Sequence, residues 1–128
     1  TDSSGRFAAM YKPFHLIGLE LSISVLSAAL RQEPTGQTRA FNGDAVAVAK
    51  RDLAPGEMLD GEGGYTVWGK LMPAKASVAH GAVPIGLAHK VPMTRPVKAG
   101  AVLSWDDITI DDSDALAARQ AHEALVSA

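Results

Sequence analysis

The chain contains no cysteine. This absence excludes disulfide bonds, catalysis by a thiolate and zinc sites with cysteine ligands. Aromatic residues make up only 5% of the sequence, whereas 47% of all residues are hydrophobic. The core of the protein is therefore predicted to consist mainly of small aliphatic side chains. A length of 128 residues leaves room for one domain.

The sequence also has no concentration of positive charge. Its 12 basic residues are scattered among 14 acidic ones and give a net charge of −2. Because binding to phosphates requires a basic face, no nucleic-acid partner is predicted. The most apolar segment, residues 13–31, is short and is interrupted by His15, Glu20 and serines, so no membrane partner is predicted either. Residues 1–6 do not follow the charged-then-apolar pattern of a secretory signal, and we expect a cytoplasmic protein. The first residue is Thr1 and not Met, from which we expect a piece of a larger protein.

A short pattern occurs twice, with the second copy 44 positions after the first. Residues 51–60 return as residues 95–104, and four positions recur in register: Arg51/Arg95, Leu53/Val97, Gly56/Gly100 and Leu59/Leu103. Each copy predicts a strand, a tight turn with glycine at positive φ, and a second short apolar stretch. Two copies are too few for a solenoid, and they indicate two half-units around one small core.

Residues 13–31 predict a helix. Pro13 suits a first turn, and apolar residues recur at helical spacing at Leu16, Leu19, Ile23, Leu26 and Leu30. A second apolar row widens this face, so the helix is expected to be buried on more than one side. In isolation it would associate with another copy or stay mobile.

The rest of the chain predicts a β unit between a linker and a terminal helix. Residues 32–44 are polar and rich in turn formers, which is typical of a linker. Short β-type runs at 45–49, 65–68, 82–88 and 102–103 alternate with Gly, Pro and Asp, which predicts a compact all-β unit over residues 45–110. Residues 111–114 offer helix-capping oxygens before an alanine-rich segment, so 111–128 is predicted to be a short helix. The predicted fold class is mainly β, with an N-terminal helix and a short C-terminal helix.

The β portion closely resembles a SAF domain, the β-clip fold of type III antifreeze proteins and of the C-terminal part of sialic acid synthases. The resemblance covers about residues 45–110. It is carried by residues 51–59, by Gly86-Leu87-Ala88, and by residues 95–103 with Trp105-Asp106-Asp107-Ile108. It implies the β-clip fold and says little about activity, because this fold serves several functions.

A second resemblance spans nearly the whole chain. Residues 10–20, 51–53, 60–65 and 69–73 look like the C-terminal third of bacterial oxidoreductases that are related to homoserine dehydrogenase. This group includes the 1-deoxy-D-xylulose 5-phosphate reductoisomerase-like enzymes. In these proteins an NAD(P)-binding Rossmann domain precedes a substrate domain, and a SAF unit closes the chain. The resemblance implies that residues 1–31 end a substrate domain and that the partners are the Rossmann and substrate domains of the parent enzyme, in a homo-oligomer.

The resemblance implies a dinucleotide cofactor for the parent and none for this chain. No strand followed by G-x-G-x-x-G at a helix start occurs in the sequence, so NAD(P) binding is expected elsewhere in the parent enzyme. This chain alone is not expected to be catalytic. Its role would be to cover the active site or to build the oligomer, for an enzyme that acts on a small anionic carbonyl or hydroxy compound.

The candidate substrate-binding residues are Tyr11, Lys12, His15 and Lys70. A cation and an imidazole near a helix start could bind an anion or move a proton. The alternative is that Lys12 is solvated and that His15 donates to a backbone carbonyl. Lys70 follows Trp68 in a segment that could bind a sugar or sugar phosphate, with the aromatic ring stacked on the sugar and the lysine paired with its negative charge.

The alternative for this second segment is that Trp68 and Leu71 fill the core while Lys70 and Lys75 stay in water.

Two further patterns have simpler explanations than a site. The cluster Gly61-Glu62-Gly63-Gly64 precedes β-type sequence and not a helix, which favours a structural turn over a phosphate loop. His80 and His89 have no carboxylate at a ligand-like spacing, so no metal site is predicted.

Two other functional classes compete with the oxidoreductase. One is a stand-alone SAF module that binds a carbohydrate or sugar acid, as in the SAF domains attached to sugar-acid dehydratases. It ranks second because such a module has no need of the broad helix at 13–31. The other is an ice-binding protein, which the charged turns at 50–52 and 106–107 disfavour.

Overall fold

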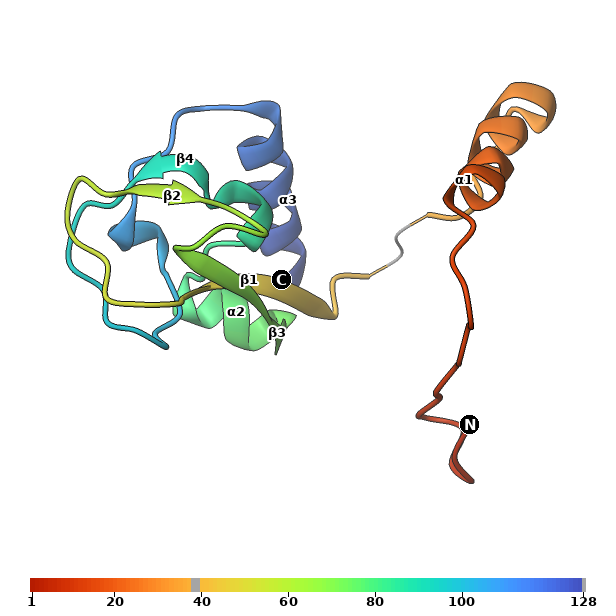
Figure 1. The fold of residues 1–128 in the computed structure, drawn as a ribbon, viewed down its shortest axis with the longest axis horizontal. Coiled ribbons are helices and arrows are strands. Elements are labelled where there is room, and N and C mark those ends of the chain that lie inside the picture. Colours follow the sequence, from red (N-terminus) through yellow and green to blue (C-terminus); the bar gives the residue numbers. More distant parts are fainter. Residues whose placement is uncertain (38–39, 128) are drawn as a thin grey trace. The chain divides into compact units, whose positions relative to one another are not determined.

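The repeated motif lies in the second of two units. The computed structural model describes residues 1–37 and 40–127, and the chain divides into the units Thr1–Arg39 and Ala40–Ala128. The first unit contains α1 (Ile17–Leu26), which a π-helical turn at Ser27–Arg31 extends. The second unit contains β1 (Gly43–Ala49), β2 (Met58–Asp60), β3 (Val67–Pro73), α2 (Ala74–His80), β4 (His89–Pro92) and α3 (Asp114–Ser127), which are labelled in Figure 1. No helix among the described residues is long and apolar enough to cross a membrane.

The two copies of the motif pair with each other at equivalent positions. Leu53 and Val97 exchange both of their backbone hydrogen bonds, at 2.8 and 3.1 Å. The two turn glycines adopt nearly identical left-handed conformations, with φ of 81° at Gly56 and 82° at Gly100. The sequence prediction of a positive φ at both glycines is therefore confirmed.

Hydrogen bonds between the halves repeat with the same 44-residue offset. The Gly56 N–H donates to the Met93 carbonyl at 2.8 Å, and the Gly100 N–H donates to the Ala49 carbonyl at 2.8 Å. The strand pairing repeats with the same offset. Met58 of β2 pairs with Pro92 of β4, and the equivalent residues Val102 and Val48 also pair with each other. The two halves of the second unit are therefore related by a pseudo-two-fold axis, and each half completes the backbone hydrogen bonding of the other.

The core lies between the two halves. Leu59 and Leu103, which are equivalent in the repeat, are 1% and 0% exposed. The cluster around them is aliphatic, as the composition predicts: Ala47, Ala49, Leu53, Val67, Val83, Ala88, Val91, Met93, Val97 and Ile108.

The fold is mixed α/β and not mainly β. The predicted all-β unit contains a helix, α2, whose sequence Ala-Lys-Ala-Ser-Val-Ala-His favours a helix and which ends at Gly81 in the left-handed conformation. The sheets are small: β1 pairs with β3 and β2 pairs with β4, both antiparallel. The expected β runs at 82–88 and 102–103 contribute isolated bridges instead of strands, and Ile85–Leu87 forms a 3₁₀ turn.

The N-terminal helix begins later than predicted, at Ile17 and not at Pro13. The side chain of Glu20 accounts for this, because it folds back and accepts the N–H of Leu16 at 3.3 Å together with bonds from two side chains further upstream. The predicted burial of this helix is not observed, since α1 contains no buried residue.

The predicted linker at 32–44 ends earlier than expected, because β1 begins at Gly43. Thr38 and Arg39 of this segment lie outside the described residues. Asp44, which the prediction placed in the linker, is 6% exposed and forms an ion pair with Arg119 of α3 at 2.7 Å. Ser113 caps α3 by accepting the Leu116 N–H at 3.2 Å.

Candidate functional site

The first group of candidate residues gathers on one carboxylate ahead of α1. Lys12 forms an ion pair with Oε1 of Glu20, and Nδ1 of His15 lies 2.5 Å from Oε2 of the same side chain. The Lys12 ammonium, assisted by the Leu16 N–H and by His15, holds the pKa of Glu20 below its usual value. The structure therefore brings Lys12 and His15 together. The alternative in which His15 donates to a backbone carbonyl is replaced by a contact with a carboxylate.

Sequence reasoning did not select Glu20 as a site residue. The available signal was its place on the polar stripe of the predicted helix, five residues after His15 and eight residues after Lys12. A carboxylate that contacts one nitrogen of an imidazole fixes the orientation of the ring, as in many acid–base pairs. The chemistry available here is thus an oriented imidazole next to an ammonium group.

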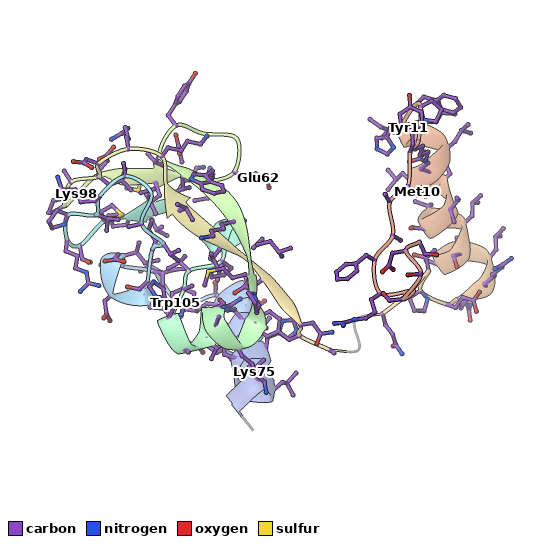
Figure 2. The ribbon with its side chains drawn as sticks, turned by 90° about the horizontal axis from the view of Figure 1, so that it is seen from below. Met10, Tyr11, Glu62, Lys75, Lys98 and Trp105 are labelled. Carbon is purple, nitrogen blue, oxygen red and sulfur yellow. The ribbon has the colours of Figure 1, made fainter. Side chains whose placement is uncertain are left out.

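Tyr11, labelled in Figure 2, is exposed, as are most side chains of this unit. The large apolar residues of α1 are also exposed, including Leu19 at 69% and Ile23 at 64%. An apolar helix without a covered face is typical of an element whose packing partner is another segment or molecule.

Lys70 lies in the second unit, on β3, and its side chain is exposed. The interpretation that Trp68 and Leu71 fill the core is wrong. Leu71 is 79% exposed and Trp68 is 45% exposed. Lys75 stays in water at the start of α2, as that interpretation expected.

The glycine cluster between β2 and β3 forms a turn that Asp60 organises. Its carboxylate accepts the N–H of Tyr65 at 2.6 Å and the N–H of Thr66 at 3.0 Å, and it also accepts the Thr66 hydroxyl. The Asp60 side chain packs directly against the backbone of Gly64, because a Cβ atom on Gly64 would lie 2.1 Å from Cγ of Asp60. The prediction of a structural turn is confirmed, and the residue that fixes the turn is a carboxylate that sequence reasoning did not select.

We expect the Asp60 turn to loosen as the pH falls from about 4 to about 2. The hydrogen bonds from the Thr66 hydroxyl and from the N–H groups of Tyr65 and Thr66 lower the pKa of Asp60 to about 2. The contribution of Asp60 to stability is therefore complete above the unfolded-state pKa near 3.8 and is lost as the pH falls through about 2. An NMR titration of the Tyr65 and Thr66 amides measures this transition.

Two variants make the measurement specific to this turn. Asp60→Asn should abolish the acid transition and speed hydrogen exchange of both amides at neutral pH. Glu62→Gln removes an exposed carboxylate of the same turn and should change neither. A midpoint near 4 at Asp60 would contradict the prediction.

The two histidines of the second unit contact backbone oxygens. His89 Nδ1 lies 3.0 Å from the Asp60 carbonyl, and His80 Nε2 lies 3.4 Å from the Val102 carbonyl. Among residues 1–37 and 40–127, no three His, Asp or Glu side chains cluster so that they could hold a metal ion.

Comparisons with known proteins add no assignment to this geometry. No protein-family model matches the chain, and no curated protein matches it.

Proposed function

We propose that this chain is the C-terminal, SAF-containing region of a cytoplasmic NAD(P)-dependent oxidoreductase that acts on a small anionic carbonyl or hydroxy compound. The NAD(P) site belongs to the Rossmann domain of the parent enzyme. The second unit covers the active site or builds the oligomer, and the first unit is the end of the substrate domain.

The pseudo-two-fold axis of the second unit supports the SAF part of this proposal. The repeat that carries the SAF resemblance predicts two half-units around one core, and here the halves exchange equivalent hydrogen bonds at Leu53/Val97 and at the two turn glycines. This observation concerns fold, and it does not distinguish an enzyme from a binding module.

The observation that carries the oxidoreductase proposal is the apolar, uncovered helix α1. Burying a side chain such as Leu or Ile stabilises a protein by about 1.5–3 kcal/mol, so a helix with this many exposed apolar residues needs a covering layer. A substrate domain in the parent enzyme would provide that layer. A stand-alone binding module has no use for such a helix.

Lys12 and His15 have distinct roles in this proposal. Lys12 attracts the anionic group of the substrate, while Glu20 balances its charge until the substrate arrives. Glu20 holds Nδ1 of His15, so Nε2 is the nitrogen that would exchange a proton with the hydroxyl or carbonyl oxygen. Tyr11 supports the substrate. Lys70 belongs to the second unit and lines the approach of the clip.

Replacing Lys12 or His15 by alanine in the intact parent enzyme is expected to lower kcat/KM by about tenfold or more, which corresponds to about 1.4 kcal/mol of transition-state stabilisation. The assay follows NADH or NADPH consumption with 2-oxo acids and phosphorylated ketoses as probes. Arg31→Ala removes an exposed cation of the same unit and is the matched control for Lys12. An unchanged kcat/KM in both Lys12→Ala and His15→Ala would rule out these roles.

The second candidate is a stand-alone SAF module with a carbohydrate or sugar-acid site. The exposed Tyr65 and Trp68 near Lys70 favour it, because aromatic faces and a cation suit a sugar acid. The intact mass of the polypeptide in its native cell separates the two proposals. A mass that corresponds to several hundred residues supports the oxidoreductase. A mass near 13.4 kDa, which is that of these 128 residues, supports the module.

A further inference from the structure

Three donors from the segment ahead of α1 surround the carboxylate of Glu20. Oε1 of Glu20 contacts the Lys12 ammonium and accepts the Leu16 N–H at 3.3 Å. Oε2 lies 2.5 Å from Nδ1 of His15. An ammonium group and a backbone N–H are donors that an ionised carboxylate, which only accepts hydrogen bonds, commonly uses. The chain therefore forms a carboxylate-binding site and fills it with its own side chain.

The donors remain accessible to solvent while Glu20 occupies them. The side chains of Lys12 and His15 are 48% and 68% exposed, and that of Glu20 is 30% exposed. An ion pair in this position is solvated and contributes little to stability, so another anion can compete for the ammonium group. The two oxygens of Glu20 also have different partners. Oε1 can therefore be displaced while Oε2 stays on the imidazole.

We infer that the substrate of this site carries a carboxylate, and that this group replaces Oε1 of Glu20 on the Lys12 ammonium and on the Leu16 N–H. Oε2 keeps its contact with His15, so the imidazole stays oriented during the exchange. Glu20 is therefore an internal competitor for Lys12. The inference rests on the proposed function, because it names the anionic group of the same substrate.

The charge that remains at the site favours a carboxylate over a phosphate. Lys12 supplies one positive charge, and Glu20 keeps one negative charge beside it after the exchange. A carboxylate adds one negative charge, whereas a phosphate monoester adds about 1.5 to 2 at pH 7. Because these like charges are close together, the repulsion from Glu20 is larger for the phosphate. A carboxylic acid is therefore the substrate class that the site accepts best.

Binding can be measured in the full chain by NMR, with pyruvate and glycerol 3-phosphate as probes. The Leu16 amide reports the exchange directly, since its acceptor changes. In the wild type, pyruvate should shift this amide and bind with a lower dissociation constant than glycerol 3-phosphate. Glu20→Gln removes the competing charge and keeps the length of the side chain. We expect it to lower the dissociation constant for pyruvate by about tenfold or more and to reduce the preference for pyruvate.

Glu33→Gln is the matched control for this variant. Glu33 pairs with Arg31 at 3.4 Å in the same unit, so its substitution changes the net charge by the same amount without touching Lys12. The dissociation constant for pyruvate, measured at the Leu16 amide, should stay unchanged in this control. In the double variant Lys12→Ala/Glu20→Gln, the gain from Glu20→Gln should be lost, because the ammonium group that binds the probe is absent.

Equal dissociation constants for pyruvate in the wild type and in Glu20→Gln would overturn the inference. Tighter binding of glycerol 3-phosphate than of pyruvate in the wild type, or no shift of the Leu16 amide, would also overturn it. If Glu20→Gln disrupted α1, the comparison of the two probes in the wild type would still decide. Failure here leaves the kinetic test of Lys12 and His15 open, because that test covers any anionic substrate. Conversely, unchanged kinetics together with pyruvate binding would rule out the oxidoreductase roles and leave the carboxylate site in place.

Discussion

Replacing Arg119 by alanine is expected to destabilise the second unit by about 3–5 kcal/mol, because the substitution leaves a buried carboxylate without its counter-ion. Arg119 and Asp44 are 8% and 6% exposed, and their charged groups lie 2.7 Å apart. The Ser77 hydroxyl donates to the same carboxylate from α2. This pair joins α3 to the start of β1. Helix α2 packs against both of these elements, and the three are labelled in Figure 1.

The guanidinium of Arg119 has further partners that the variant would also lose. It donates from Nε to Glu123 at 2.7 Å and lies 5.2 Å from the centre of the Phe41 ring. Cation–π contacts of this kind contribute about 0.5–1 kcal/mol at exposed sites and more where water is excluded. Removing Arg119 therefore weakens the attachment of α3 as well as the ion pair.

The pH dependence of this loss distinguishes an unpaired charge from a simple loss of packing. Burial alone would raise the pKa of Asp44, but the Arg119 guanidinium and the Ser77 hydroxyl outweigh it, and the net pKa is lowered. In the wild type, Asp44 therefore contributes stability above its unfolded-state pKa of about 3.8, and this contribution is lost as the pH falls through the lower folded-state value. In Arg119→Ala burial dominates and raises the pKa of Asp44, so the variant's deficit should shrink as the pH falls toward 4.

Urea denaturation at pH 7 and at pH 4 measures both effects. The double variant Asp44→Leu/Arg119→Leu should be more stable than Arg119→Ala, because it buries no unpaired charge. Lys75→Ala, an exposed cation on α2, should change stability by less than about 0.5 kcal/mol. A deficit in Arg119→Ala that is below about 1 kcal/mol and independent of pH would contradict the role given to this pair.

Some features could be predicted from the sequence because a local repeat, a turn residue or the composition indicates them. The 44-residue repeat predicted the left-handed turns at Gly56 and Gly100, because a tight turn of that kind strongly favours glycine. The small aliphatic core followed from composition, and the turn at 61–64 followed from its glycines.

Features that depend on distant residues could not be predicted. Nothing near Asp44 in the sequence indicates Arg119, so the start of β1 read as a polar linker. Helix α2 has only seven residues between β-type segments, too few for a periodic pattern. The exposure of Trp68 and Leu71 depends on which segments pack against β3, and neither residue reveals this in the sequence. The grouping of Lys12 and His15 on Glu20 depends on how residues 12–16 fold back along the chain.

We expect Leu59→Ala and Leu103→Ala each to destabilise the second unit by about 2–5 kcal/mol. The pseudo-two-fold axis relates the two positions. Both leucines are at most 1% exposed and occupy equivalent places in the two halves. Removing either side chain leaves a cavity in an aliphatic cluster whose neighbours come from the other half and relax only in part. Because the surroundings are related by the axis, the two losses should agree within about 1 kcal/mol.

Thermal and urea unfolding of the two variants measures the losses, with Leu125→Ala as the control. Leu125 is 71% exposed on α3, and its truncation should cost less than about 0.5 kcal/mol. The double variant Leu59→Ala/Leu103→Ala would lose about 4–10 kcal/mol, which matches or exceeds the whole stability of many small domains, and it should be largely unfolded. If one leucine proved essential while the other cost less than about 1 kcal/mol, the two halves would not be energetically equivalent. In that case one half would serve as the scaffold on which the other folds.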